Sequence, residues 1–345
     1  MRNQTVAFIM AGRRQRGRRW ILVTALLAVL ACLLCGAMLL LGSTVYPVKD
    51  VIRALSGEPI KGVSFAVNTI RLPRMLAGVF AGFAFGLAGS TFQTMLRNPL
   101  ANPNVIGITS GSSAAAVFCI TVLHTSRAVV SLASVIAGLV TVTVIYLLSK
   151  RKPFSVGRLI LVGIGIQAML DAIISYLLLV GAQQDIPAAL RWLTGSLNGA
   201  QMHELPPLVI TVLIFAPVVI VLGKHLSLLE LGEQSATSLG VDTDKTRIAL
   251  ILSAVCMIAL ATATTGPIAF VSFLSGPIAK RLAGVGFSFS NVIPVGLVGV
   301  NLVLAADLIG QFAFEVRYPV GIMTGILGAP YLIFLLIQMN RKGDL

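Results

Sequence analysis

Charged residues are scarce in this sequence, and acidic residues are scarcer than basic ones. Only 11% of the 345 residues are charged, with 12 Asp and Glu against 26 Lys and Arg; soluble domains carry roughly a quarter. Hydrophobic residues make up 57% of the chain, and the mean hydropathy is +0.94. A chain this apolar cannot cover its surface with polar side chains. The composition therefore excludes a soluble domain and predicts an all-α, polytopic membrane protein.

Side chains that perform chemistry are also few. The chain has three histidines, at 124, 203 and 225, and no group of His, Cys and carboxylates has catalytic or metal-binding spacing. Cys32 and Cys35 are spaced like half of a metal motif, but no second pair follows. No segment matches the G-x-x-x-x-G-K-[ST] phosphate loop. We expect a protein without enzyme activity, cofactor or metal of its own.

The uncharged stretches predict about ten transmembrane helices. Each stretch is near or above the roughly 20 residues that span a bilayer as a helix. The longest is interrupted by Gly266-Pro267 and Gly276-Pro277, so it is counted as one full helix and one shorter, broken helix. The stretches are 20–42, 75–96, 98–126, 128–149, 159–184 (broken only by Asp171), 205–223, 248–279, 282–306 and 318–340.

The basic residues predict the orientation. With both termini in the cytoplasm, most of the 26 basic residues fall on the inner side, including those at 13–19. Residues 1–19 are then a cytoplasmic basic arm, and 20–342 form a single transmembrane domain. The basic arm is interpreted as a topology signal, so the expected surroundings are the lipid of the cell (plasma or inner) membrane, with no nucleic acid.

An ordered series of motifs runs from residue 71 to the end of the chain. It contains Arg71-Leu-Pro-Arg74, Asn98-Pro-Leu-Ala-Asn-Pro103, Leu231-Gly-Glu233, Gly266-Pro-Ile-Ala-Phe-Val271, and Tyr318-Pro-Val-Gly321 with Asp307 before it. The series closely resembles the permease family of ATP-driven importers for iron–siderophores, haem and vitamin B12. The resemblance implies a subunit that passes an iron–siderophore chelate inward, with haem and vitamin B12 as alternatives. It also implies partners: ATP-hydrolysing subunits, an extracytoplasmic binding protein and a second permease.

The resemblance assigns Arg71 and Arg74 to docking of the binding protein. Both would lie at the outer start of a helix, where a cation opposes the helix dipole. One alternative is that both side chains reach the membrane interface with no partner; the other is docking, since charge pairs fix the register of a complex. Gln311 stands where family members often carry Arg, and we predict that Arg317 supplies the missing docking charge.

The segment 227–242 resembles the element that couples the permease to the ATPase, a short helix that docks in a groove of the partner. The residues assigned to it are Glu230, Leu231, Gly232, Glu233, Ala236, Leu239 and Gly240. Glu230, Glu233 and Leu239 are the expected contacts.

Small and helix-breaking residues are assigned either to tight packing or to the transport path. Glycines at four-residue spacing let helix backbones approach closely, but their smooth face could also line a route for a bulky solute. Breaks at membrane depth often border the substrate route in transporters. The residues concerned are Gly78, Gly82, Gly86, Gln93, Asn98, Pro99, Gly266, Pro267, Gly276 and Pro277.

Two other functions are open to a chain of this kind. An ion-coupled secondary transporter would need ion ligands inside the membrane, and only Asp171 and Asp307 are acids within the predicted spans. A membrane enzyme would need a catalytic group of residues. Because the motifs depart from the family pattern in places, we favour a heterodimer with a more typical permease over a homodimer.

Overall fold

The computed structural model describes residues 2–99, 101–150, 156–230, 232–284 and 292–342. All regular structure in these ranges is helical. The long helices are α1 (Arg2–Leu40), α3 (Leu72–Met95), α5 (Arg127–Ser149), α6 (Val156–Val180), α8 (Pro206–Glu230), α10 (Thr243–Thr265), α12 (Val292–Phe312) and α13 (Val320–Lys342). The shorter ones are α2 (Val48–Leu55), α4 (Ile108–Thr121), α7 (Ile186–Thr194), α9 (Glu233–Ser238) and α11 (Val271–Ala283).

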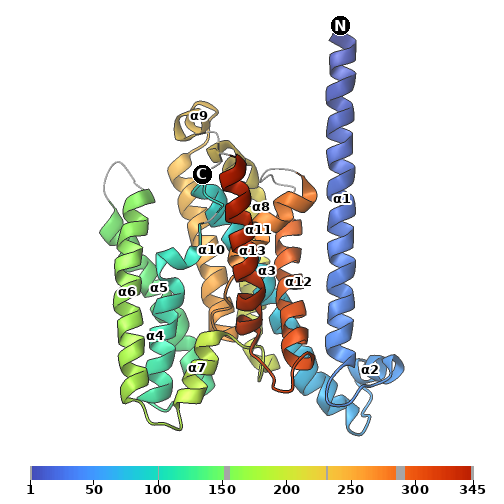
Figure 1. The fold of residues 1–345 in the computed structure, drawn as a ribbon, viewed down its shortest axis with the longest axis vertical. Coiled ribbons are helices and arrows are strands. Elements are labelled where there is room, and N and C mark those ends of the chain that lie inside the picture. Colours follow the sequence, from blue (N-terminus) through green and yellow to red (C-terminus); the bar gives the residue numbers. More distant parts are fainter. Residues whose placement is uncertain (1, 100, 151–155, 231, 285–291, 343–345) are drawn as a thin grey trace.

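The long helices lie side by side in one bundle, as Figure 1 shows. Eight helical segments of the described residues are long and apolar enough to cross a membrane. The shorter helices α4 and α11 occupy the two remaining predicted span positions, so the expected polytopic all-α fold is confirmed. We call the two ends of the bundle the α9 end and the α2 end, after the short helices found there. The start of α1 and the end of α13 both lie at the α9 end.

Several predicted boundaries were wrong. The second span begins ten residues early, because the π-helical segment Phe65–Arg71 runs directly into α3. The third is short: α4 has 14 residues, about 21 Å of helix, against a hydrocarbon core of ~30 Å. The ninth span does not end at 306, since α12 continues to Phe312 through Asp307. A buried ion partner, which hydropathy does not register, keeps this carboxylate inside the helix.

Helix α3 is the centre of the bundle. It packs against α12, α10, α11 and α8, and it is buried along nearly its whole length. The surrounding helices carry most of the large exposed apolar side chains, for example Leu26 and Leu33 in α1 and Leu161 and Leu179 in α6. Such exposure is expected of surfaces that face lipid or another membrane subunit.

Candidate functional site

Arg71 is a structural cap in this fold. Its guanidinium donates hydrogen bonds to the carbonyls of Leu39 (2.8 Å), Leu40 (2.9 Å) and Thr44 (2.6 Å), and it lies 4.7 Å from the ring centre of Tyr46. The last carbonyls of a helix lack partners and carry its negative dipole end. The cation that looked misplaced at the start of one helix therefore stabilises the end of α1. Its docking role stays a prediction.

Arg74 forms a two-point ion pair with Asp307 that joins α3 to α12. Arg74 Nε lies 2.9 Å from Asp307 Oδ2, and a terminal nitrogen lies 2.8 Å from Oδ1. Gln311 donates a further bond of 2.7 Å to the same carboxylate. The Asp307 side chain is 1% exposed, and a charge this buried needs such partners. Arg74 is thus engaged within the chain, and its docking role also stays a prediction.

Arg317 is placed differently. It lies in the segment between α12 and α13, it is exposed, and no hydrogen bond or ion pair joins it to another described residue. Of the three arginines predicted to dock a partner, it is the one whose charge is presented to the surroundings.

The predicted coupling segment is partly helical. Residues 227–230 continue α8, and a short helix, α9, follows a turn at Gly232. Ala236 is fully buried against the bundle, whereas Leu239 is 61% exposed. Leu231 lies outside the described residues, and so do the side chains of Glu230 and Glu233. Gly240 has a φ of +83°, which favours glycine, and it leads into α10.

The glycine series of α3 packs helices together. A Cβ on Gly82 would lie 2.7 Å from the carbonyl oxygen of Gly299 and 2.9 Å from Val300 Cα, so α3 and α12 touch through their backbones. Gly86 faces the same helix, with Val295 O at 3.0 Å, and Gly78 faces Leu304. Of the two alternatives left open by the sequence, the geometry at these glycines favours packing over a solute route.

Gly266-Pro267 ends α10; Gly266 is buried, Pro267 is half-buried, and Gly266 borders a second cavity of about 460 Å³ lined in part by α5 and α7. The Thr265 carbonyl accepts a hydrogen bond of 2.7 Å from Ser196 N. Gly266 has a φ of +72°, and a Cβ there would lie 3.0 Å from Gly195 Cα. The break thus packs against the segment that follows α7. The Thr265 carbonyl accepts a hydrogen bond from that segment, as irregular backbone at membrane depth requires.

Gln93, Gly276 and Pro277 form one unit between α3 and α11. Proline has no N–H, so Pro277 leaves the carbonyl of Phe273, four residues earlier, without its helical donor. Gln93 Nε2 donates a hydrogen bond of 2.8 Å to that carbonyl. Gly276 has no side chain where the Gln93 amide oxygen approaches. The sequence singled out these residues without showing that they belong together.

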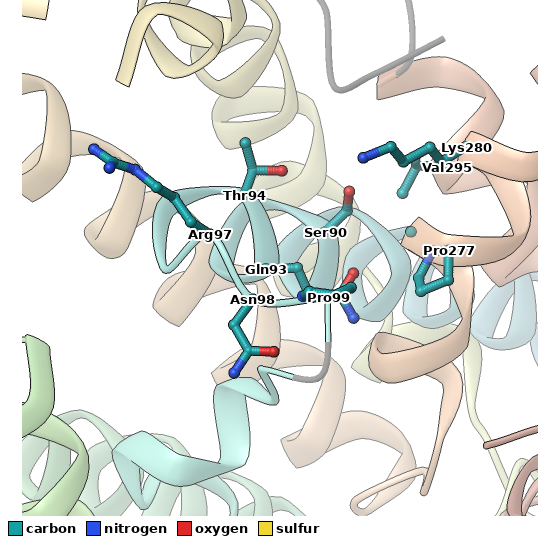
Figure 2. A pocket seen from close by; sticks show the side chains of 10 residues that line it. Ser90, Gln93, Thr94, Arg97, Asn98, Pro99, Pro277, Lys280 and Val295 are labelled. Carbon is teal, nitrogen blue, oxygen red and sulfur yellow. The ribbon is translucent and has the colours of Figure 1, made fainter. Parts of the chain in front are cut away.

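The same residues border a cavity of about 300 Å³ at the α9 end, shown in Figure 2. Asn98 and Pro99 also line it, so five residues predicted for packing or transport meet here. Five further lining residues were not among the predicted site residues: Ser90, Thr94, Arg97, Lys280 and Val295. Ser90, Arg97 and Lys280 lie three or four positions from Gln93 or Gly276, and this spacing was the available signal.

Asp171 lies on an outward face of α6. It is exposed, and no ion pair or side-chain hydrogen bond joins its carboxylate to another described residue. Small residues surround it at helical spacing on the same exposed face: Gly165, Ala168, Ala172 and Ser175. A lone carboxylate near the middle of a span is costly against lipid and marks a face turned to protein or water.

Comparisons with known proteins give one consistent result. Residues 8–338 match the model described as the FecCD transport family. The chain is 36% identical over 329 residues to the ferric enterobactin transport system permease protein FepG of Escherichia coli (strain K12), covering 94% of this chain and 98% of that protein. It is 34% identical over 322 residues to the permease protein FepD of the ferric enterobactin transport system of the same organism, covering 92% and 95%. A solved structure described as an inward-facing conformation of a putative metal-chelate type ABC transporter superposes with a TM-score of 0.80 at 26% identity, covering 92% and 99%.

Proposed function

Because the chain belongs to the FecCD transport family, we propose that it is the permease subunit of an ATP-driven importer whose cargo is a ferric chelate of the siderophore class. The observation that carries the proposal is the match over nearly the whole chain to permeases named for ferric enterobactin transport. The chain forms the membrane path, and ATP is hydrolysed on a separate subunit.

In this proposal the α9 end faces the cytoplasm and the ATPase. Basic residues support the orientation: Arg19 donates from α1 to the carbonyls of Leu282 (2.9 Å) and Arg281 (3.1 Å) at the end of α11, and Arg97 lies at the same end. Ala236 anchors α9 while Leu239 projects from it, an arrangement suited to insertion into a groove of the partner. Both termini are then cytoplasmic.

The α2 end receives the binding protein. Arg317 presents its charge there, while Arg71 and Arg74 hold α1, α3 and α12 in place beneath it. An exposed cation at the rim of an interface steers encounter and sets register more than it adds affinity. An acidic patch on the binding protein is the matching chemistry.

A second permease covers the Asp171 face of α6. The carboxylate then borders water or a partner group in place of lipid, and the small residues beside it permit close packing. We favour a heterodimer because two E. coli relatives, FepG and FepD, are both named as permeases of one ferric enterobactin system. A homodimer would be the alternative.

Reconstitution into vesicles tests the function. The chain alone should move no ferric chelate under any ion gradient, whereas adding the second permease, the ATPase and the binding protein should give ATP-dependent uptake. Haem and vitamin B12 serve as competing cargoes. Gradient-driven transport by the chain alone would instead identify a secondary transporter.

The same vesicles test the docking surface. We expect Arg317→Glu to slow uptake at low binding-protein concentration, with the effect shrinking as salt is raised. Lys61→Glu reverses another exposed charge in the segment after α2 and serves as the control. Equal uptake by both variants and the parent would remove Arg317 from the docking surface.

A further inference from the structure

The cavity between α3 and α11 contains hydroxyl groups without a protein partner. Ser90 is 3% exposed and Thr94 is 8% exposed, and both line the cavity. Neither hydroxyl has a hydrogen bond to a described residue, whereas Thr91 of the same helix donates to the Leu87 carbonyl at 2.8 Å. Hydroxyls that face a cavity without a protein partner are free to donate hydrogen bonds to whatever occupies that cavity.

The charges around the cavity are of one sign. Arg97 and Lys280 line it, and none of the described residues that line it is acidic. Lys280, in the last turn of α11, has no hydrogen bond or ion pair to a described residue, and Figure 2 shows its amine extending toward the side of α3 that carries Ser90 and Thr94. Hydroxyl donors beside an ammonium group form the usual environment of an oxyanion.

We propose that this cavity binds a small oxyanion, a phosphate or carboxylate group, between the hydroxyls of α3 and the ammonium group of α11. The site goes beyond cargo transport and does not depend on which chelate is carried. Its position gives it a mechanical consequence: Arg97 Nε donates to the Leu229 carbonyl at 3.1 Å, in the last turn of α8 before α9. A bound anion would therefore tie α3 to α11, close to the point where the segment after α3 contacts α8 through Arg97.

The test is a titration of the full-length chain, in phosphatidylcholine nanodiscs, with inorganic phosphate at constant ionic strength. We expect saturable binding by calorimetry, weakened about tenfold or more by Thr94→Val and by Lys280→Gln. Thr91→Val removes a hydroxyl that is already bonded within α3, and Lys150→Gln removes an exposed cation away from the cavity. Both controls should bind as the parent does.

Two further measurements keep the result decisive. Thr94→Ser should restore binding if Thr94→Val acts through the hydroxyl, and gel filtration checks that each variant is folded. Adding phosphatidylglycerol to the nanodiscs distinguishes the two sources of the oxyanion. If the lipid competes with inorganic phosphate, the ligand is a lipid headgroup; if the affinity for phosphate is unchanged, the ligand is a free anion. The site would be overturned if the parent shows no saturable binding, or if Thr94→Val and Lys280→Gln both bind phosphate as tightly as the parent does. Either result would leave the import function untouched.

Discussion

At the scale of single residues, polar side chains in this bundle complete the backbone of other helices. Gln93 donates a hydrogen bond to the Phe273 carbonyl, which has no helical donor because of Pro277. Arg71 donates hydrogen bonds to the last carbonyls of α1. Both act where a helix has lost its internal hydrogen bonds, at a proline in one case and at a terminus in the other. Burial makes such repair necessary, because a buried carbonyl without a donor costs free energy.

The Gln93–Pro277 relationship predicts a non-additive pair of substitutions. Gln93→Met keeps the size of the side chain but leaves the Phe273 carbonyl unpaired, so it should lower the free energy of unfolding by about 1–3 kcal/mol. Pro277→Ala restores a backbone N–H within α11, so Gln93→Met should cost less in that background. Thermal unfolding of the four proteins gives the coupling. Additive effects would refute the relationship, and Gln167→Met in α6 is the control.

At the scale of helices, the position of α3 depends on close contact with α12. Gly82 of α3 faces the carbonyl oxygen of Gly299 in α12. Backbone atoms at this distance cannot move aside as the end of a flexible side chain can. The crossing of these two helices therefore fixes the centre of the bundle, and the Arg74–Asp307 ion pair joins the same two helices nearer the α2 end.

Gly82→Ala should destabilise the bundle by about 1–3 kcal/mol, because the new methyl group forces α3 and α12 apart. Gly36→Ala in α1 is the matched control, since a Cβ at Gly36 meets nothing within 4 Å. That control should change the free energy of unfolding by less than about 1 kcal/mol. Thermal unfolding in detergent compares the two variants. Equal losses of stability would show that the backbone contact between α3 and α12 at Gly82 does not stabilise the bundle.

At the scale of the whole molecule, the two ends of the bundle differ in what they present. The α9 end carries the projecting start of α1, α9 and the cavity between α3 and α11. The α2 end carries α2, α7 and the exposed Arg317. An importer needs this polarity, because one end must meet the ATPase and the other must meet the cargo carrier.

Labelling of intact cells tests the orientation. In Leu239→Cys, a membrane-impermeant thiol reagent should react only after the membrane is permeabilised. In Arg317→Cys it should react with intact cells. The native cysteines Cys32, Cys35, Cys119 and Cys256 all lie within helices of the bundle, and the parent chain provides their background. The reverse pattern would invert the topology and remove the proposed importer assignment.

The sequence by itself determined the all-α membrane fold, the set of spans and the family. Apolar length, charge spacing and ordered motifs are local properties, so they can be read along the chain. It also singled out Gln93, Gly276 and Pro277, but only as separate residues.

Only the tertiary structure decided what most of these residues contact. In the structure Arg71 binds the end of α1 and Arg74 pairs with the carboxylate of Asp307. The face of α6 that carries Asp171 points outward. It also gathered Ser90, Thr94 and Lys280 around one cavity. These pairings join residues up to 233 positions apart. Hydropathy and motif spacing do not encode them, because they depend on how the helices pack.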